Sequence, residues 1–168
     1  MTKTFRISEE ALDALSEDAR AQNVSMNTLV NQLLISYVEF DRWMRKVHLI
    51  KIAGSTLRLF FDGISPETAK AAGEEQVREM AETFILSHYG ALTAESVLAY
   101  IRTISEHGGV YEYNEVTRVG SKTLTLLHEL GMNGSIFIST AAVKLLAEVG
   151  IKADCKLSDG AVILTLAS

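Results

Sequence analysis

The residues that could carry chemistry in this chain are few and widely spaced. The four histidines, His48, His88, His107 and His128, form no HxH or HExxH pattern, and the single cysteine, Cys155, has no partner for an internal disulfide. Transition-metal sites use His and Cys ligands at short, characteristic spacings. We therefore predict no metal site and no bound cofactor.

No arrangement of a nucleophile, a base and an orienting residue is evident, and Gly108-Gly109 lacks the spacing of a phosphate-binding loop. We do not expect an enzyme. Polar and aromatic side chains predict one candidate pocket for a small-molecule effector, unless these residues form a sheet face whose hydroxyls are in water. The candidate residues are Tyr89, Tyr111, Tyr113, Arg118 and His128.

Composition is that of a folded globular protein. The chain has 168 residues, 48% hydrophobic and 22% charged, and 16 basic against 21 acidic residues make its net charge -5. This acidity argues against a protein that coats nucleic acid by charge alone. No apolar run is long enough to span a membrane, and the start, MTKTFRISEE, lacks a signal-peptide core. We expect a cytoplasmic protein without a membrane partner.

The pattern of hydrophobic residues divides the chain into residues 1–46 and 47–168. In the first part, Phe5 and Ile7 alternate with Thr2, Thr4 and Arg6, which predicts a short strand with two faces. Two helices should follow it.

The ends of these two helices are marked by local signals. Ser8 is a typical N-cap, and the first helix should run to about Gln22, where Asn23 tolerates a left-handed stop. Ser25 should cap the second helix, which we expect to continue toward Lys46. The apolar face of the second helix is broad, with Leu29, Val30, Leu33, Leu34, Tyr37 and Val38.

A module of this kind cannot be stable alone. A single strand leaves backbone groups unpaired, and about 46 residues are near the lower size limit for an independent core. Two copies would pair their strands as a ribbon over a shared core. The outward side chains of such a ribbon fit the major groove of DNA, where Arg binds guanine and Thr contacts several base edges.

Residues 2–40 resemble the ribbon-helix-helix domains of the Arc, MetJ and CopG type. The matching stretches are TKTFRISEEALDAL and ARAQNVSMNTLVNQLLISYVEF. The resemblance implies a homodimer that binds a near-palindromic DNA operator, with the pairing of dimers into a tetramer left open. It implies base-reading roles for Thr2, Thr4 and Arg6, with Lys3 beside them, and phosphate contacts for Ser25 and Asn27.

Residues 47–168 are predicted to form an α+β domain with the element order β-α-α-β-β-α-β-β. The expected strands are residues 49–61, 110–119, 121–127, 151–157 and 161–166, and the expected helices are residues 66–89, with a break near Gly73, 94–107 and 136–149. The stretch TLTLLHELGMNGSIFISTAAVKLLAEVG resembles the end of the 4-vinyl-reductase and haem-NO-associated small-ligand domains. We assign no ligand from this resemblance.

These patterns predict a homodimeric DNA-binding transcriptional regulator. The C-terminal domain would support oligomerisation or sense an effector. Two alternatives remain: a module that only dimerises, and an antitoxin that binds a protein partner and regulates its own synthesis.

Overall fold

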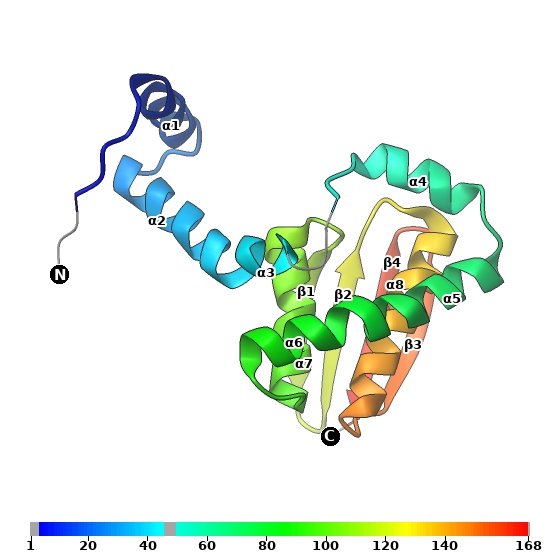
Figure 1. Cartoon of the computed structure of the whole chain (residues 1–168). Helices are drawn as coiled ribbons and strands as arrows, with labels where there is room; N and C mark the ends of the chain where they lie inside the picture. Colours follow the sequence, from blue (N-terminus) through cyan, green and yellow to red (C-terminus); the bar gives the residue numbers. More distant parts are fainter. Residues whose placement is uncertain (1–3, 46–49, 168) are drawn as a thin grey trace. The chain divides into compact units, whose positions relative to one another are not determined.

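The structure is a computed structural model, and it describes residues 4–45 and 50–167. The chain divides into two compact units, Met1–Arg42 and Trp43–Ser168 (Figure 1). This division lies close to the boundary expected near residue 46.

The first unit contains the two predicted helices, α1 (Glu9–Ala21) and α2 (Met26–Ser36). The hydroxyl groups of Ser8 and Ser25 accept hydrogen bonds from the first turns of these helices, as their types predicted. Asn23, between the helices, has a φ of 54°, which confirms the left-handed stop.

The second helix continues beyond Ser36, as expected. A π-helical turn over Tyr37–Asp41 follows α2, and the short helix α3 (Arg42–Met44) follows that turn. The boundary between the two units therefore falls within a nearly continuous helical segment.

The predicted N-terminal strand is wrong. Thr4 to Ser8 form no strand, so the described part of the first unit begins with helices and contains no β-ribbon. Thr2 and Lys3 lie outside the described residues. The physical reason is that alternation marks two faces but supplies no partner, and a strand without a partner leaves its N–H and C=O groups unpaired.

The second unit contains a four-stranded antiparallel sheet with strand order β1-β2-β4-β3. Its strands correspond to the last four strands expected from the sequence, and the first hairpin turns at Gly120, where φ is 79°. The strands are β1 (Glu112–Arg118), β2 (Ser121–Leu127), β3 (Ala153–Ser158) and β4 (Ala161–Ala167).

Helices cover one face of this sheet (Figure 1). Helix α8 packs against β3 and β4, and α5 packs against α8. These helices are α4 (Gly54–Asp62), α5 (Pro66–Gln76), α6 (Glu82–Tyr89), α7 (Ala94–Thr103) and α8 (Gly131–Glu148). The fully buried side chains between helices and sheet include Val77, Ile85, Ile101, Leu124, Leu126, Leu145, Leu146 and Leu164.

The expected helix bounds at residues 66, 89 and 94 are confirmed, because α5 begins at Pro66, α6 ends at Tyr89 and α7 begins at Ala94. Ser65 and Thr93 cap α5 and α7 through their hydroxyl groups, and Pro66 occupies the first turn of α5. Gly90 ends α6 in the left-handed conformation, with φ of 79°.

The expected extended segment over residues 49–61 is wrong, because its second half is helix α4. The apolar residues Leu57 and Phe61 stand four apart, on one side of a helix, and Phe61 is buried with its ring 5.3 Å from that of Phe137 on α8. This tertiary contact outweighs the β-branched, strand-like composition of the preceding residues. The predicted element order is therefore also wrong in its first element.

Helix α8 begins at Gly131, five residues before the predicted start at Ile136. Asn133 and Gly134, which precede the predicted start, are inside the helix. A Cβ atom at Gly134 would lie 2.3 Å from Cβ of Leu130, so glycine permits a tight first turn. The amide of Asn133 donates to the carbonyl groups of Phe61 and Ile64 and so holds the end of α4.

Gly73 does not break its helix, contrary to the prediction. It is buried in the middle of α5, and a Cβ atom there would lie 2.6 Å from the carbonyl oxygen of Phe137 and 3.0 Å from Cβ of Thr140. The residue is glycine because the backbones of α5 and α8 approach closely at this point.

We predict that Gly73→Ala lowers the free energy of unfolding of the second unit by about 1–3 kcal/mol, because the added methyl group forces α5 and α8 apart. The measurement is denaturant unfolding followed by the fluorescence of Trp43, the single tryptophan. Gly54→Ala is the matched control, since a Cβ atom there meets nothing within 4 Å. Equal stabilities of the two variants would contradict the close packing of α5 on α8.

Candidate functional site

The predicted DNA-contacting residues that the structure describes all lie on the surface of the first unit. Thr4 and Arg6 are exposed in the segment before α1, and Ser25 and Asn27 are exposed at the start of α2. The four residues thus form two pairs along the chain, one before α1 and one after it.

Ser25 and Asn27 have different local roles. The hydroxyl oxygen of Ser25 accepts the backbone N–H of Thr28 at 3.0 Å and lies 2.7 Å from the hydroxyl of Thr28. Ser25 therefore orders the turn that begins α2 and presents the helix N-terminus, whose partial positive charge favours anions. The side chain of Asn27 is exposed in the first turn of the same helix.

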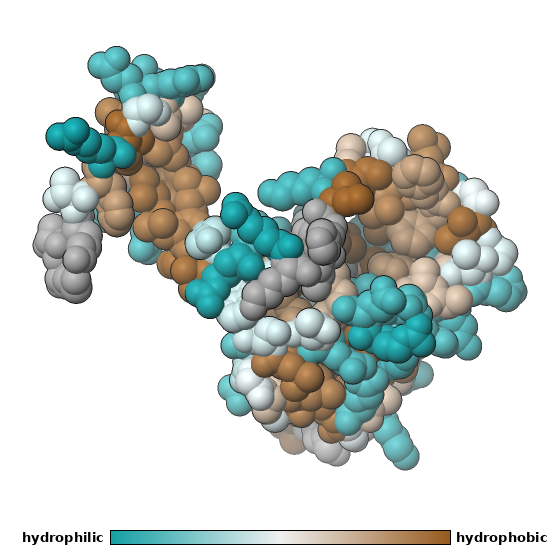
Figure 2. All heavy atoms as spheres, in the orientation of Figure 1, coloured by the Kyte–Doolittle hydropathy of each residue, from teal (hydrophilic) through white to brown (hydrophobic). Residues whose placement is uncertain are grey.

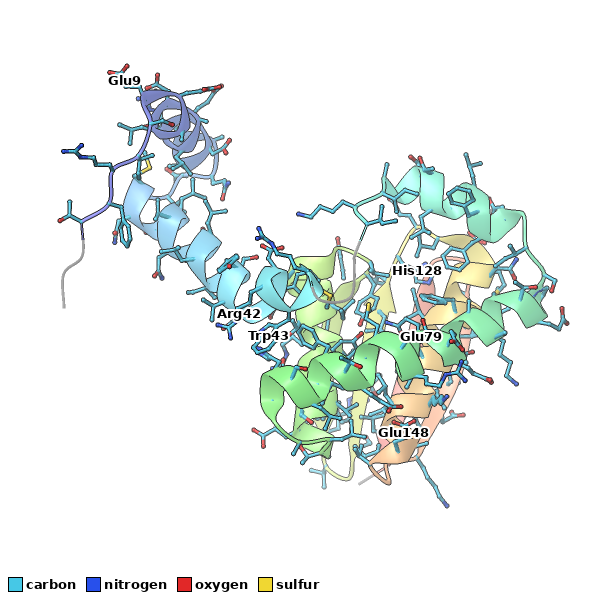
Figure 3. All side chains as sticks on the ribbon, viewed as in Figure 1. Glu9, Arg42, Trp43, Glu79, His128 and Glu148 are labelled. Carbon is cyan, nitrogen blue, oxygen red and sulfur yellow. The ribbon has the colours of Figure 1, made fainter. Side chains whose placement is uncertain are left out.

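Carboxylate groups are unevenly distributed over the first unit. Between Ala19 and Val38 the sequence has no Asp or Glu, and α2 has no charged residue. Arg6 is exposed in the segment before α1, whose start is marked by Glu9 in Figure 3, and Arg20 is exposed in the last turn of this helix. The acidic residues of α1 are Glu9, Glu10, Asp13, Glu17 and Asp18.

Arg20 was not singled out from the sequence. It is exposed in the last turn of α1, and its carbonyl oxygen accepts the backbone N–H of Asn23 at 3.1 Å in the turn that leads to α2. A basic residue just before a left-handed stop and a helix cap is the signal that would have identified it.

The first unit leaves a broad apolar face uncovered. Ala19 and Leu29 are its buried contacts between α1 and α2, but Leu34 on α2 is 53% exposed and Phe5 before α1 is 74% exposed. Brown, hydrophobic side chains follow α2 in Figure 2. The other exposed apolar residues of this unit are Ile7, Leu12, Leu33, Ile35, Tyr37 and Val38.

In the second unit, the residues of the predicted ligand pocket make separate contacts. The hydroxyl of Tyr89 lies 3.0 Å from that of Thr103, and the hydroxyl of Tyr111 donates to the carbonyl of Ile101 at 2.9 Å. Both tyrosines are thus tied to α7 and help to hold it in place.

Arg118 and His128 lie at opposite ends of the first hairpin. Arg118 pairs with Ser121 beside the turn, whereas His128 directly follows Leu127, which pairs with Glu112 at the other end. Seven strand residues separate these ends by about 20 Å. The five predicted residues therefore do not line one pocket.

Tyr113 belongs to an ionic network around Glu115 on the helix-covered side of the sheet. The carboxylate of Glu115 accepts hydrogen bonds from Tyr113, from Arg102 at 3.2 Å and from Lys122 at 2.7 Å. Lys122, followed by Tyr113, lowers the pKa of Glu115 to about 2, and burial raises the pKa of Tyr113 to about 12. This network depends on strand register, so sequence reasoning missed Arg102, Glu115 and Lys122.

His128, which is labelled in Figure 3, is the centre of a buried hydrogen-bond network. Its Nδ1 accepts the backbone N–H of Leu130 at 3.1 Å, and its Nε2 lies 2.9 Å from the hydroxyl of the fully buried Ser135. That hydroxyl donates in turn to the carbonyl of Ser158 at the β3–β4 hairpin. The network joins the end of β2, the start of α8 and the second hairpin.

This arrangement determines the proton positions. Because Nδ1 accepts a hydrogen bond, Nε2 carries the ring proton, and this N–H group donates a hydrogen bond to the hydroxyl oxygen of Ser135. His128 therefore does not act as a base toward Ser135, because the hydroxyl of Ser135 donates its hydrogen bond to the carbonyl oxygen of Ser158. The pair is a structural connection and not an activated nucleophile.

Arg58 reinforces the same corner of the second unit. It donates to the carbonyl of Glu129 at 3.2 Å and forms ion pairs with Asp159 at 3.3 Å and Asp62 at 3.6 Å. These contacts tie α4 to the loop after β2 and to the second hairpin.

Within residues 4–45 and 50–167, no group of three or more His, Cys, Asp or Glu side chains is placed to hold a metal ion. No helix in this part of the chain is both long and apolar enough to cross a membrane. Comparison with known proteins finds no matching family model and no matching curated protein.

We predict that His128→Ala lowers the free energy of unfolding by about 2–4 kcal/mol at pH 8, because it leaves the N–H of Leu130 and the hydroxyl of Ser135 without partners and opens a cavity. Denaturant unfolding followed by Trp43 fluorescence measures this loss.

The same variant tests the pH dependence. Burial lowers the pKa of His128, Arg58 lowers it further, and Asp159 opposes them. Below pH 6.5 the unfolded chain therefore takes up a proton that folded His128 resists, so wild-type stability should fall as pH drops from 7 toward 5. This part of the pH dependence should be absent in His128→Ala, and identical slopes in both proteins would contradict it.

Proposed function

We propose that the chain is a DNA-binding transcriptional regulator that acts as a homodimer through its first unit. The observation that carries the proposal is the exposure of two segments, the one before α1 and the one over the turn and start of α2. They carry exposed Arg6 and Arg20 and a capped helix N-terminus, and no carboxylate lies between Ala19 and Val38. Such segments suit a phosphate backbone, although the whole chain is acidic.

Dimerisation is proposed because of the uncovered apolar face. Phe5, Leu34 and their neighbours are too exposed for a stable unit of this size, and folded units near 40 residues usually need an additional source of stability. A second copy offers the same apolar residues and gives a symmetric, self-complementary interface. Two-fold symmetry in the protein requires a near-palindromic operator.

The resemblance to ribbon-helix-helix domains supports this proposal in part. Two helices and a left-handed turn stand at the positions that the resemblance implies. Because the segment before α1 is not a strand, we assign DNA contact to the side chains of Thr4, Arg6 and Asn27, with Arg20 as a further phosphate contact. Arg6 is the residue best suited to read a guanine.

The second unit would then support assembly. It has its own buried core, so it does not resemble the disordered tail by which an antitoxin binds its toxin. Binding to DNA and a single cysteine are consistent with a reducing, cytoplasmic location.

Selection of bound DNA from a random pool tests the function. The proposal predicts enrichment of a near-palindromic site, and Arg6→Ala should weaken binding to this site at least about fivefold, which corresponds to the lower limit of about 1 kcal/mol for a bidentate base contact. Fluorescence anisotropy with labelled DNA measures the affinity.

Arg118→Ala is the matched control, since Arg118 is an exposed arginine at the hairpin turn of the second unit. It should bind the selected DNA as the wild type does. If no site is enriched, or if both variants bind equally well, DNA reading by the first unit is wrong.

We further predict that Leu34→Asp prevents association through the first unit, because a buried carboxylate without a partner is strongly unfavourable in an apolar interface. Sedimentation equilibrium of the full chain should show a smaller assembly, with at least a tenfold weaker association. Leu59→Asp on α4 provides the control, because Leu59 is also exposed but lies in the other unit. Unchanged association of Leu34→Asp would exclude α2 from the interface.

A further inference from the structure

The two edges of the sheet in the second unit differ. At the β1 edge, the backbone N–H of Tyr113 donates to the hydroxyl of Ser105 at 2.9 Å, and the π-helical turn Ile104–Gly108 packs against the strand. At the other edge, β3 pairs with β4 and contacts α8, and among the described residues no strand pairs with its outer side. The backbone groups on this side are therefore available to another strand.

The hydrogen-bond pattern determines which residues of β3 point their backbone groups outward. Because Tyr113 donates away from β2, the alternation of an antiparallel ladder can be followed across the registers to β4 and β3. Asp154, Lys156 and Ser158 bond to β4, and Ala153, Cys155 and Leu157 present their N–H and C=O groups at the outer edge.

The side chains of β3 carry opposite charges two residues apart. Asp154 and Lys156 are both exposed on the sheet face opposite α8, and their neighbours on β4 are the uncharged Thr165 and Ile163. A lone lysine commonly keeps an edge strand from pairing. Here Asp154, two residues from Lys156, makes the edge complementary to itself where an antiparallel pairing sets these two residues opposite each other.

Few two-fold registers align the outward backbone groups. Pairing centred on Cys155 places Asp154 of each copy opposite Lys156 of the other. Centring on Ala153–Cys155 places Asp154 opposite itself, and centring on Cys155–Leu157 places Lys156 opposite itself, so both of these bring like charges together. A register centred on Leu157 pairs fewer residues and no opposite charges. A register centred on Ala153 also brings opposite charges together, Asp154 of one copy and Lys152 of the other, but Lys152 precedes β3, so fewer strand residues pair. Charge and the number of paired strand residues together therefore favour the pairing centred on Cys155.

We propose that the β3 edge pairs with the β3 edge of a second copy of this chain, antiparallel and centred on Cys155, to form a continuous eight-stranded sheet across two molecules. In this pairing Cys155 exchanges backbone hydrogen bonds with its counterpart, and so does Ala153 with Leu157. Leu157, now 40% exposed, would be partly covered by the second copy. The inference concerns the second unit alone and does not depend on DNA binding.

The wild-type test is zero-length cross-linking with a carbodiimide, which joins a carboxylate and an amine only when they are in contact. An equal mixture of ¹⁵N-labelled and unlabelled full-length chain, without DNA, is treated and analysed by mass spectrometry. The expected product is a mixed-isotope peptide that links Asp154 of one copy to Lys156 of another. Its absence, with both side chains shown to react with single-ended reagents, overturns the pairing.

A charge-exchange experiment tests the register. Asp154→Lys has two lysines on the edge and Lys156→Asp has two aspartates, so each variant alone should repel itself. A short bismaleimide can join two chains only through Cys155, since it is the single cysteine. Each variant alone should give at most a tenth of the wild-type cross-linked dimer, and an equal mixture should restore it.

Two results of this experiment overturn the register. One is an equal yield of cross-linked dimer for the wild type and each single variant, and the other is a mixture that stays as low as its components. Restoration in the mixture also shows that both variants are folded. Because no DNA is present, failure here is distinguishable from failure of the proposed function.

Discussion

The first unit depends on one constraint: α1 is too short to cover the whole apolar face of α2. Helix α1 covers Leu29, but Leu34 and Phe5 remain exposed. Since burial of apolar surface is the main favourable term in folding, a unit that leaves so much of it in water gains little stability from its own core. The proposed association of two copies would be the direct remedy, and it would also place two Arg6 side chains in a symmetric relation suited to a palindromic site.

The second unit has the opposite character. Its sheet and its helices enclose a full core, with Leu124 and Leu146 completely buried, and the His128 network joins its corner. Among its described strands, the one whose outer side has no strand partner and no covering turn is β3. The two units would therefore associate for different physical reasons, one through hydrophobic burial and the other through backbone hydrogen bonds whose register is selected by Asp154 and Lys156.

Features determined by local interactions could be predicted from the sequence. Ser8 and Ser25 are predictable as helix caps because a hydroxyl group needs only the next turn of backbone to act. The N-terminal strand was wrong because a strand needs a partner, and helix α4 was missed because its conformation depends on the distant contact of Phe61 with Phe137. Contact of the predicted side chains with DNA stays a prediction. The five residues of the predicted ligand pocket do not line one pocket, because strand register places Arg118 and His128 at opposite ends of the first hairpin.

Association through the first unit can be tested directly by an isotope-filtered NOE experiment on an equal mixture of ¹³C-labelled and unlabelled full-length chains. This experiment detects only contacts between different copies. If two copies associate through α2, NOEs should connect the methyl groups of Leu34 or Val38 in one copy with apolar side chains of the first unit, such as the Phe5 ring, in the other. A spectrum without intermolecular NOEs to these residues, at concentrations where the protein is associated, would contradict it.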